Sequence, residues 1–253
     1  DNDRTEMFVE AINQVLTIWE GDAPYNLKGK YWNITTEKTM IPSLGQGFIN
    51  KPYQKPHPPI VVTAVAPFSK GVTAAAERGW DSISANFLQP KWVASHWPKY
   101  VEGCETAGRK ADPKNWRVAK SIFVADDDRV AEEYGTVEGG PYHFYYNSLF
   151  AKLKIAGRAN LFKTERDQPD EDLNPETIVD QLVIRGSVNS VVDQILAFRE
   201  EIGDFGTLLY AGHDWKDKGL ARRSMELMAA EVMPRVNEAI GNSVDDEQKR
   251  NAG

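Results

Sequence analysis

The first candidate for chemistry is a polar turn between an apolar run and a helix of small residues. The run at 60–65 predicts a strand buried on both faces, and residues 72–78 predict the helix. Unpaired backbone amides and the helix dipole favour an anion at such a turn. The turn therefore predicts a phosphate site, although Ser69 could equally be an ordinary N-cap. Its residues are Phe68, Ser69, Lys70 and Gly71.

Two further polar side chains follow predicted strands. Asn86 lies at the end of the strand predicted over 80–87, and His213 follows the strand predicted over 205–212. In a β/α barrel, the carboxyl ends of the parallel strands form one rim around the active site. We therefore expect Ser69, Asn86 and His213 to share a rim. His213 has two interpretations: a hydrogen-bond donor to a ligand, or part of the turn into the last helix.

An aromatic segment supplies candidates for substrate contacts. Residues 139–173 are predicted to be irregular, and Tyr142, His143 and Tyr146 lie near their start. The two tyrosines could line an apolar substrate pocket or form the core of an insertion. His143 could reach a substrate from a mobile lid or lie at the surface. A separate histidine, His96, is predicted to be partly exposed on a helix.

The elements that must position these residues alternate between strands and helices, which predicts a parallel sheet with right-handed crossovers. The predicted strands cover 60–65, 80–87, 116–125 and 205–212. Helical patterns cover 4–19, 72–78, 92–108, 175–183, 188–202 and 220–232, with one more helix capped by Asp126-Asp127-Asp128. Residues 25–57 are too long for an ordinary connection and predict an insertion over a site. Residues 238–253 predict a disordered tail of a single domain.

Composition narrows the class of protein. The chain has 253 residues, 41% of them hydrophobic, and a net charge of −7. The charges are spread without long blocks of one sign, which disfavours nucleic-acid binding. A single cysteine, Cys104, excludes an internal disulfide and a multi-cysteine metal site. Adjacent acidic residues at 126–128 fit a helix cap better than a metal site. We see no signal peptide or long apolar run, so we expect a soluble, cytoplasmic protein without membrane contact.

Two stretches carry a family likeness through almost the whole chain. One begins with the strand and turn described above and continues as GWDSISANF at 79–87. The other is GDFGTLLYAGHDW at 203–215, followed by ARRSMEL at 221–227 and EVMP at 231–234. Together they resemble the bacterial luciferase-like flavin monooxygenases, in the branch that includes limonene monooxygenase-like enzymes.

This resemblance implies a β/α (TIM-type) barrel that binds reduced FMN at the carboxyl ends of its strands. A separate NAD(P)H-dependent flavin reductase would supply the reduced FMN, and molecular oxygen would oxygenate a small, apolar organic substrate. Family members are commonly dimers, which implies a homodimer. By position, the turn at 67–71 is similar to the family's phosphate-binding loop, and Ala85 and Asn86 to the segment against the isoalloxazine ring. His213 would be the catalytic candidate.

The sequence also departs from the family pattern. Family members begin with about four βα units that have no counterpart here, so the strands resemble only the fifth to the eighth of a barrel. This predicts the C-terminal half of a barrel with two insertions. Two alternatives stay open. One is a flavin- or deazaflavin-dependent dehydrogenase on the same barrel, and the other is a non-catalytic flavin-binding subunit or fragment.

Overall fold

The computed structural model describes residues 3–165, 167–213 and 216–241, and the chain divides into two compact units, Asp1–Ile60 and Val61–Gly253. The first unit contains the helix α1 (Arg4–Glu20) and the antiparallel strands β1 (Asn26–Lys28) and β2 (Asn33–Thr35). The Glu10 carboxylate on α1 accepts hydrogen bonds from the backbone amides of residues 30, 31 and 32. This carboxylate therefore ties the hairpin to the helix. The predicted insertion over 25–57 begins with this hairpin.

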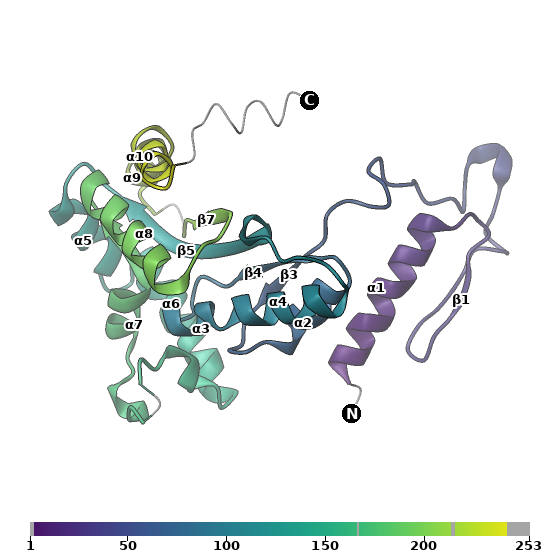
Figure 1. Cartoon of the computed structure of the whole chain (residues 1–253), viewed down its shortest axis with the longest axis horizontal. Helices are drawn as coiled ribbons and strands as arrows, with labels where there is room; N and C mark the ends of the chain where they lie inside the picture. The colour runs from purple at the N-terminus through teal and green to yellow at the C-terminus, as the bar shows by residue number, and fades with distance from the viewer. Residues whose placement is uncertain (1–2, 166, 214–215, 242–253) are drawn as a thin grey trace. The chain divides into compact units, whose positions relative to one another are not determined.

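The second unit is built on a parallel sheet of five strands (Figure 1). Its strands are β3 (Val61–Ala64), β4 (Asp81–Ser84), β5 (Trp116–Val124), β6 (Val183–Gly186) and β7 (Thr207–Ala211). All four predicted strands are present, within one to three residues of their expected ends. The strand β6 was not expected. All strand pairings within this sheet are parallel, which confirms the predicted sheet type.

The strand β5 is the centre of this sheet. Val118 pairs with both β4 and β7, and Ser121 pairs with both β6 and β7. β7 therefore lies along one edge of β5, while β4 and β6 share the other edge, one after the other. Ser121 consequently lies near the place where β4 leaves the edge and β6 begins.

Helices pack against both faces of the sheet. Buried residues of β5 at 116 and 118 pack with Phe198 and Ile202 of α8, and those at 122 and 124 pack with Ile195 of the same helix. Ala64 of β3 packs with residues of α2 and α4. The helices after β3 are α2 (Lys70–Glu77), α3 (Pro90–Ala94), α4 (His96–Thr106), α5 (Asp128–Thr136), α6 (Pro141–Ile155), α7 (Pro175–Leu182), α8 (Val188–Ile202), α9 (Lys218–Leu227) and α10 (Met233–Ala239).

The prediction of an irregular segment over 139–173 was wrong for its first half, because α6 occupies 141–155. Pro141 at the first turn starts this helix, as proline often does. Tyr142, Tyr146 and Phe150 follow at four-residue spacing and are buried in one cluster with Phe123 of β5. Burying each of these side chains contributes roughly 1.5–3 kcal/mol. The dense aromatic sequence is therefore the buried face of a helix.

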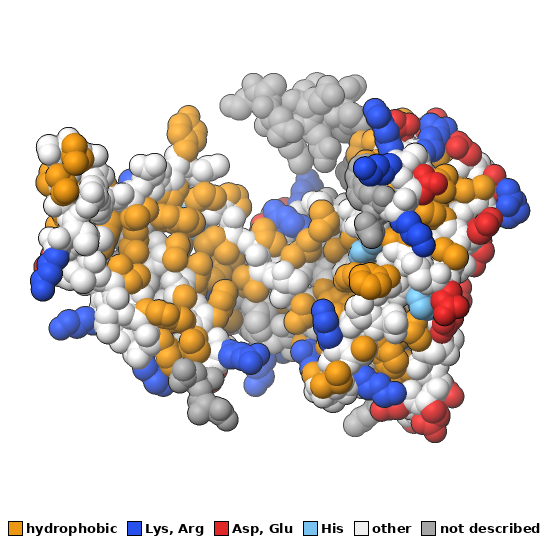
Figure 2. All heavy atoms as spheres, turned by 180° about the vertical axis from the view of Figure 1, so that it is seen from behind, with side chains coloured by type: hydrophobic (Ala, Val, Ile, Leu, Met, Phe, Trp, Pro, Cys, Tyr) orange, Lys and Arg blue, Asp and Glu red, His pale blue; other side chains and the backbone are white. Residues whose placement is uncertain are grey.

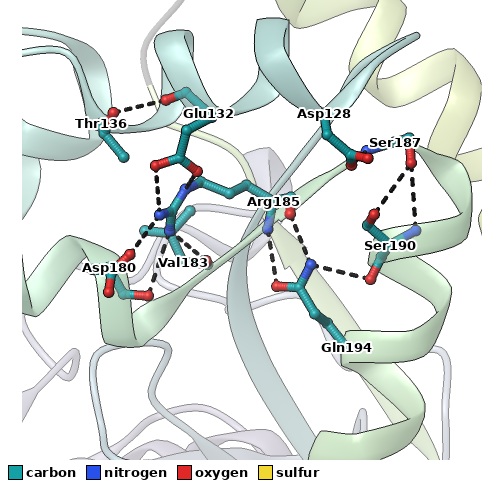
Figure 3. A network of polar contacts seen from close by, with 9 residues as sticks. All are labelled: Asp128, Glu132, Thr136, Asp180, Val183, Arg185, Ser187, Ser190 and Gln194. Atoms are coloured by element: carbon teal, nitrogen blue, oxygen red, sulfur yellow. Dashed lines mark hydrogen bonds and ion pairs between the residues drawn. The ribbon is translucent and has the colours of Figure 1, made fainter.

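A charged network holds the unexpected strand β6 in place (Figure 3). The Arg185 guanidinium donates to both carboxylate oxygens of Glu132 on α5, at 2.7 and 3.0 Å, and to Asp180 on α7 at 2.6 Å. The Gln194 amide on α8 donates to the Arg185 carbonyl at 2.7 Å. We call Arg185, Glu132 and Asp180 the Arg185 clamp. It joins β6 to two helices, so a four-residue strand can form at this edge.

Capping and the end of the chain complete the fold. Asp127 caps α5 by accepting from the amide of Val130, within the predicted cap, and Ser187 caps α8. α10 continues to Ala239, into the predicted tail, and residues 242–253 lie outside the described residues. On the face seen in Figure 2, acidic and basic side chains are interspersed over the second unit. Among the described helices, none combines the length and apolar character that crossing a membrane requires.

Candidate functional site

The site is organised around one buried hydroxyl, that of Ser121 on β5. Asn86, just past the end of β4, donates from Nδ2 to Ser121 Oγ at 2.9 Å. His213, just past the end of β7, places Nε2 2.7 Å from the same oxygen. The Tyr146 hydroxyl of α6 lies 3.0 Å from it. We call these four residues, together with Tyr145, the Ser121 cluster. The structure thus brings two predicted strand tips together, and Tyr146 with them.

Aromatic rings surround His213. Tyr145 stacks on the imidazole with ring centroids 4.1 Å apart, and its hydroxyl donates to Asn86 Oδ1 at 3.1 Å. Tyr142 meets the imidazole edge to face at 5.1 Å. Burial among these rings lowers the pKa of His213 to about 4, because desolvation penalises the charged form. His213 is therefore neutral near pH 7.

A small cavity lies beside this cluster. It has a volume of about 30 Å³ and is lined by aromatic side chains, among them Phe123, Tyr142 and Tyr210, together with His213. Such a volume holds a water molecule or two. The Tyr210 hydroxyl lies 2.9 Å from Ser224 Oγ, so its polar end is satisfied by α9. The walls of the site are consequently apolar, with polar atoms at only a few points.

The turn after β3 has the features expected of an anion site. Ser69 is the N-cap residue of α2, yet its side chain makes no capping hydrogen bond. Phe68 adopts a left-handed backbone with φ of 51°, and its amide donates to Ser95 Oγ at 2.9 Å. Lys70 is exposed at the first position of the helix. A half-buried hydroxyl, helix amides and an ammonium group fit a phosphate in charge and in donor type.

A buried histidine holds this turn against the sheet. His96 Nε2 lies 2.9 Å from the Ala66 carbonyl, and His96 Nδ1 lies 2.8 Å from Ser84 Oγ. The Trp116 indole donates to the same hydroxyl at 3.0 Å. The prediction that His96 is partly exposed was wrong, since the residue is fully buried. Burial lowers the pKa of His96, and the neutral ring links the turn to β4 and β5.

The structure separates His143 from the cluster. Its Nε2 lies 3.2 Å from the Glu176 carboxylate of α7, so it faces that helix. Tyr142 donates to the Ile122 carbonyl at 2.7 Å and presents its ring to His213. Ala85 is buried directly before Asn86. Sequence reasoning missed Ser121 and did not single out Tyr145 from the aromatic run at 142–146. The one available signal for Ser121 was a hydroxyl in a predicted strand that also contains Arg117 and Lys120, which is a weak signal.

Comparison with known proteins shows the family to which this chain belongs. The sequence profile described as luciferase-like monooxygenase matches residues 1–204. The chain belongs to this family. A luciferase-like relative, the 3,6-diketocamphane 1,6-monooxygenase of Pseudomonas putida, is 26% identical over 236 residues, which cover 91% of this chain and 62% of the relative. Limonene 1,2-monooxygenase of Rhodococcus erythropolis is 27% identical over 195 residues, 70% of this chain and 47% of the relative.

Solved structures of luciferase-like proteins have the same fold. The oxygenating constituent of 3,6-diketocamphane monooxygenase from the CAM plasmid of Pseudomonas putida, in complex with FMN, is 25% identical with a TM-score of 0.76. The match covers 93% of this chain and 64% of that one. An F420-dependent secondary alcohol dehydrogenase has a TM-score of 0.60 at 20% identity, which shows the fold alone. The fold is therefore the predicted TIM-barrel type, and the chain spans less than two thirds of the relatives' length.

Proposed function

We propose that this chain contributes to a flavin-dependent monooxygenase that uses reduced FMN and molecular oxygen to oxygenate a small, apolar organic substrate. The observation that carries the proposal is the convergence of Asn86 and His213 on Ser121, at the carboxyl ends of neighbouring parallel strands. The turn with the uncapped Ser69 follows the next strand of the same sheet. The relatives named for monooxygenase activity support this proposal.

Each group has a proposed task. Phe68, Ser69, Lys70 and Gly71 would bind the phosphate of FMN, and Ala85 and Asn86 would lie against its ring system. Bound reduced FMN supplies the electrons that activate oxygen. The protein's part is to orient the substrate and to exclude water, which would divert the activated oxygen. The rings of Tyr142 and Tyr146 would form the apolar wall, while His213 would bind the reacting groups. A separate NAD(P)H-dependent flavin reductase would provide the reduced flavin.

Three measurements test the proposal. Anaerobic titration of the purified protein with reduced FMN should show saturable binding. Adding oxygen and a small cyclic ketone or terpene should then yield a product that carries one atom of ¹⁸O from labelled O₂. Substrate oxidation without oxygen would instead indicate a dehydrogenase that transfers hydride. Failure to bind reduced FMN would contradict the proposal altogether.

A further inference from the structure

We infer that Ser121 and Tyr146 are positioning residues that fix His213 in the tautomer with its proton on Nε2, so that Nδ1 is a hydrogen-bond acceptor for ligand. The role toward ligand rests on the proposed function, whereas the tautomer follows from the Ser121 cluster itself. This assignment differs from both interpretations drawn from the sequence, in which His213 either donates a hydrogen bond to a ligand or forms part of the turn into the last helix. A neutral imidazole has one donor nitrogen and one acceptor nitrogen, and the partner of one decides the other.

The direction of the hydrogen bonds begins at Asn86. Tyr145 donates to Asn86 Oδ1, so the other amide atom, Nδ2, faces Ser121 and donates to its oxygen. The Asn86 backbone carbonyl can only accept, and the Tyr146 hydroxyl donates to it at 3.3 Å. The hydroxyl proton of Tyr146 is thereby committed to this carbonyl, so the Tyr146 oxygen can only accept a hydrogen bond from Ser121. Both neighbours of Ser121 on this side therefore have fixed roles.

The remaining roles follow by counting protons. Ser121 Oγ accepts from Asn86, donates its only proton to Tyr146 at 3.0 Å, and keeps one acceptor position. His213 Nε2, at 2.7 Å, must fill that position as a donor. The opposite arrangement has Tyr146 donating to Ser121 and Ser121 donating to His213. It makes one hydrogen bond fewer, because the Asn86 carbonyl loses the Tyr146 hydroxyl. One hydrogen bond shifts the equilibrium between the two His213 tautomers by about fivefold.

The consequence is a neutral acceptor at the rim. Nδ1 of His213 accepts from an N–H or O–H group of a ligand, such as the imide of an isoalloxazine or a hydroxyl of a substrate. Because the ring is buried among tyrosines, it stays neutral at physiological pH and keeps this polarity. The cluster would therefore select ligands that present a donor to His213 over those that present an acceptor.

The test is ¹⁵N NMR of the protein with labelled histidine, recorded without flavin. The wild type should show His213 with protonated Nε2 and unprotonated Nδ1. Tyr146→Phe removes the acceptor for the Ser121 proton, which then turns toward His213 Nε2. We expect the Nδ1-protonated tautomer to predominate in that variant. Ser121→Ala removes the directing partner, and we expect a mixture of both tautomers.

Tyr142→Phe is the matched control, because it removes a neighbouring tyrosine hydroxyl that bonds to Ile122 and lies outside the proton chain. Its His213 tautomer should equal that of the wild type. Thermal unfolding of each variant checks that it folds. An unchanged tautomer in both folded Tyr146→Phe and folded Ser121→Ala would overturn the inference. The spectra need no flavin, so the two proposals are tested separately. The tautomer pattern can hold in a protein that fails to bind FMN, and FMN can bind to a protein in which the tautomer pattern fails.

Discussion

Two polar networks lie along the carboxyl half of β5, and they differ in charge. The Arg185 clamp places a guanidinium whose side chain is 9% exposed against two carboxylates, which are 58% and 71% exposed (Figure 3). The Ser121 cluster consists of hydroxyls, one amide and a neutral imidazole. Burial raises the pKa of Tyr146, so its hydroxyl also stays uncharged. One network therefore pairs opposite charges, and the other contains no charged group.

The difference in charge corresponds to a difference in role, because one network holds the fold together and the other is proposed to bind a ligand. In the Arg185 clamp, both oxygens of Glu132 and one oxygen of Asp180 are committed to the guanidinium, so the network is closed and fixes β6. In the Ser121 cluster, Nε2 of His213 is committed to Ser121 Oγ, and the role proposed for the cluster is toward a ligand. Neutral groups cost less to desolvate than charges do, which allows an apolar pocket beside them. We expect the first network to control stability and the second to control binding.

The largest expected effect comes from neutralising both carboxylates of the clamp, with Glu132→Gln and Asp180→Asn together. The buried guanidinium then loses its counter-charges, and the free energy of unfolding should fall by about 3 kcal/mol. Denaturant unfolding monitors this change. Glu133→Gln on the same helix is the control, because its pair with Arg129 is highly exposed, and the change should stay within about 0.5 kcal/mol. Equal stability of the double variant and the wild type would show that the clamp does not hold the fold.

A smaller effect of opposite sign is expected at Lys120, the neighbour of Ser121 on β5. Its ammonium lies over the Phe198 ring at 4.8 Å, and burial lowers its pKa to about 8, against a weaker opposing attraction from Glu201. The shift from 10.5 costs about 3 kcal/mol below pH 8, since one pKa unit corresponds to about 1.4 kcal/mol. Lys120→Met removes this cost but also a cation–π contact of about 1 kcal/mol.

Lys120→Met should therefore raise the free energy of unfolding by about 2 kcal/mol at pH 7. Between pH 8 and 10.5, Lys120 is mostly deprotonated in the folded protein but mostly protonated in the unfolded chain. The stability of the wild type relative to the variant should rise through this window, so the gain should disappear by its upper end. Unfolding curves at several pH values measure this dependence. A gain that persists at high pH would argue against a desolvated charge as its source.

The sequence predicted the parts of the site that local patterns specify. The strand β3 belongs to a nearly continuous apolar run, and β4, β5 and β7 are short extended segments between helical patterns, so they and the polar tips Asn86 and His213 could be located. Two failures have tertiary causes. The strand β6 depends on Arg185 meeting carboxylates from two other helices, which no local pattern reveals. Ser121 became a centre only when β4 and β7 met on opposite edges of β5.

Histidines show the same limit. His96 was expected to be partly exposed on its helix. The Ser84 hydroxyl and the Ala66 carbonyl, both distant in sequence, supply the partners that allow it to be buried. His143 faces Glu176, because α6, which was not predicted, packs beside α7. Burial of a polar residue depends on its partners, so it could not be inferred from the segment that carries it.

The most direct test of the account is the affinity of Ser69→Ala for FMN and for riboflavin. Loss of one hydrogen bond to a phosphate should weaken FMN binding about tenfold and leave riboflavin binding unchanged. Ser187→Ala is the matched control, because Ser187 also follows a parallel strand and caps its helix, yet its hydroxyl is already engaged by Ser190. That variant should bind both flavins as the wild type does. Equal loss of both flavins in Ser69→Ala, or no loss of either, would contradict a phosphate site at this rim.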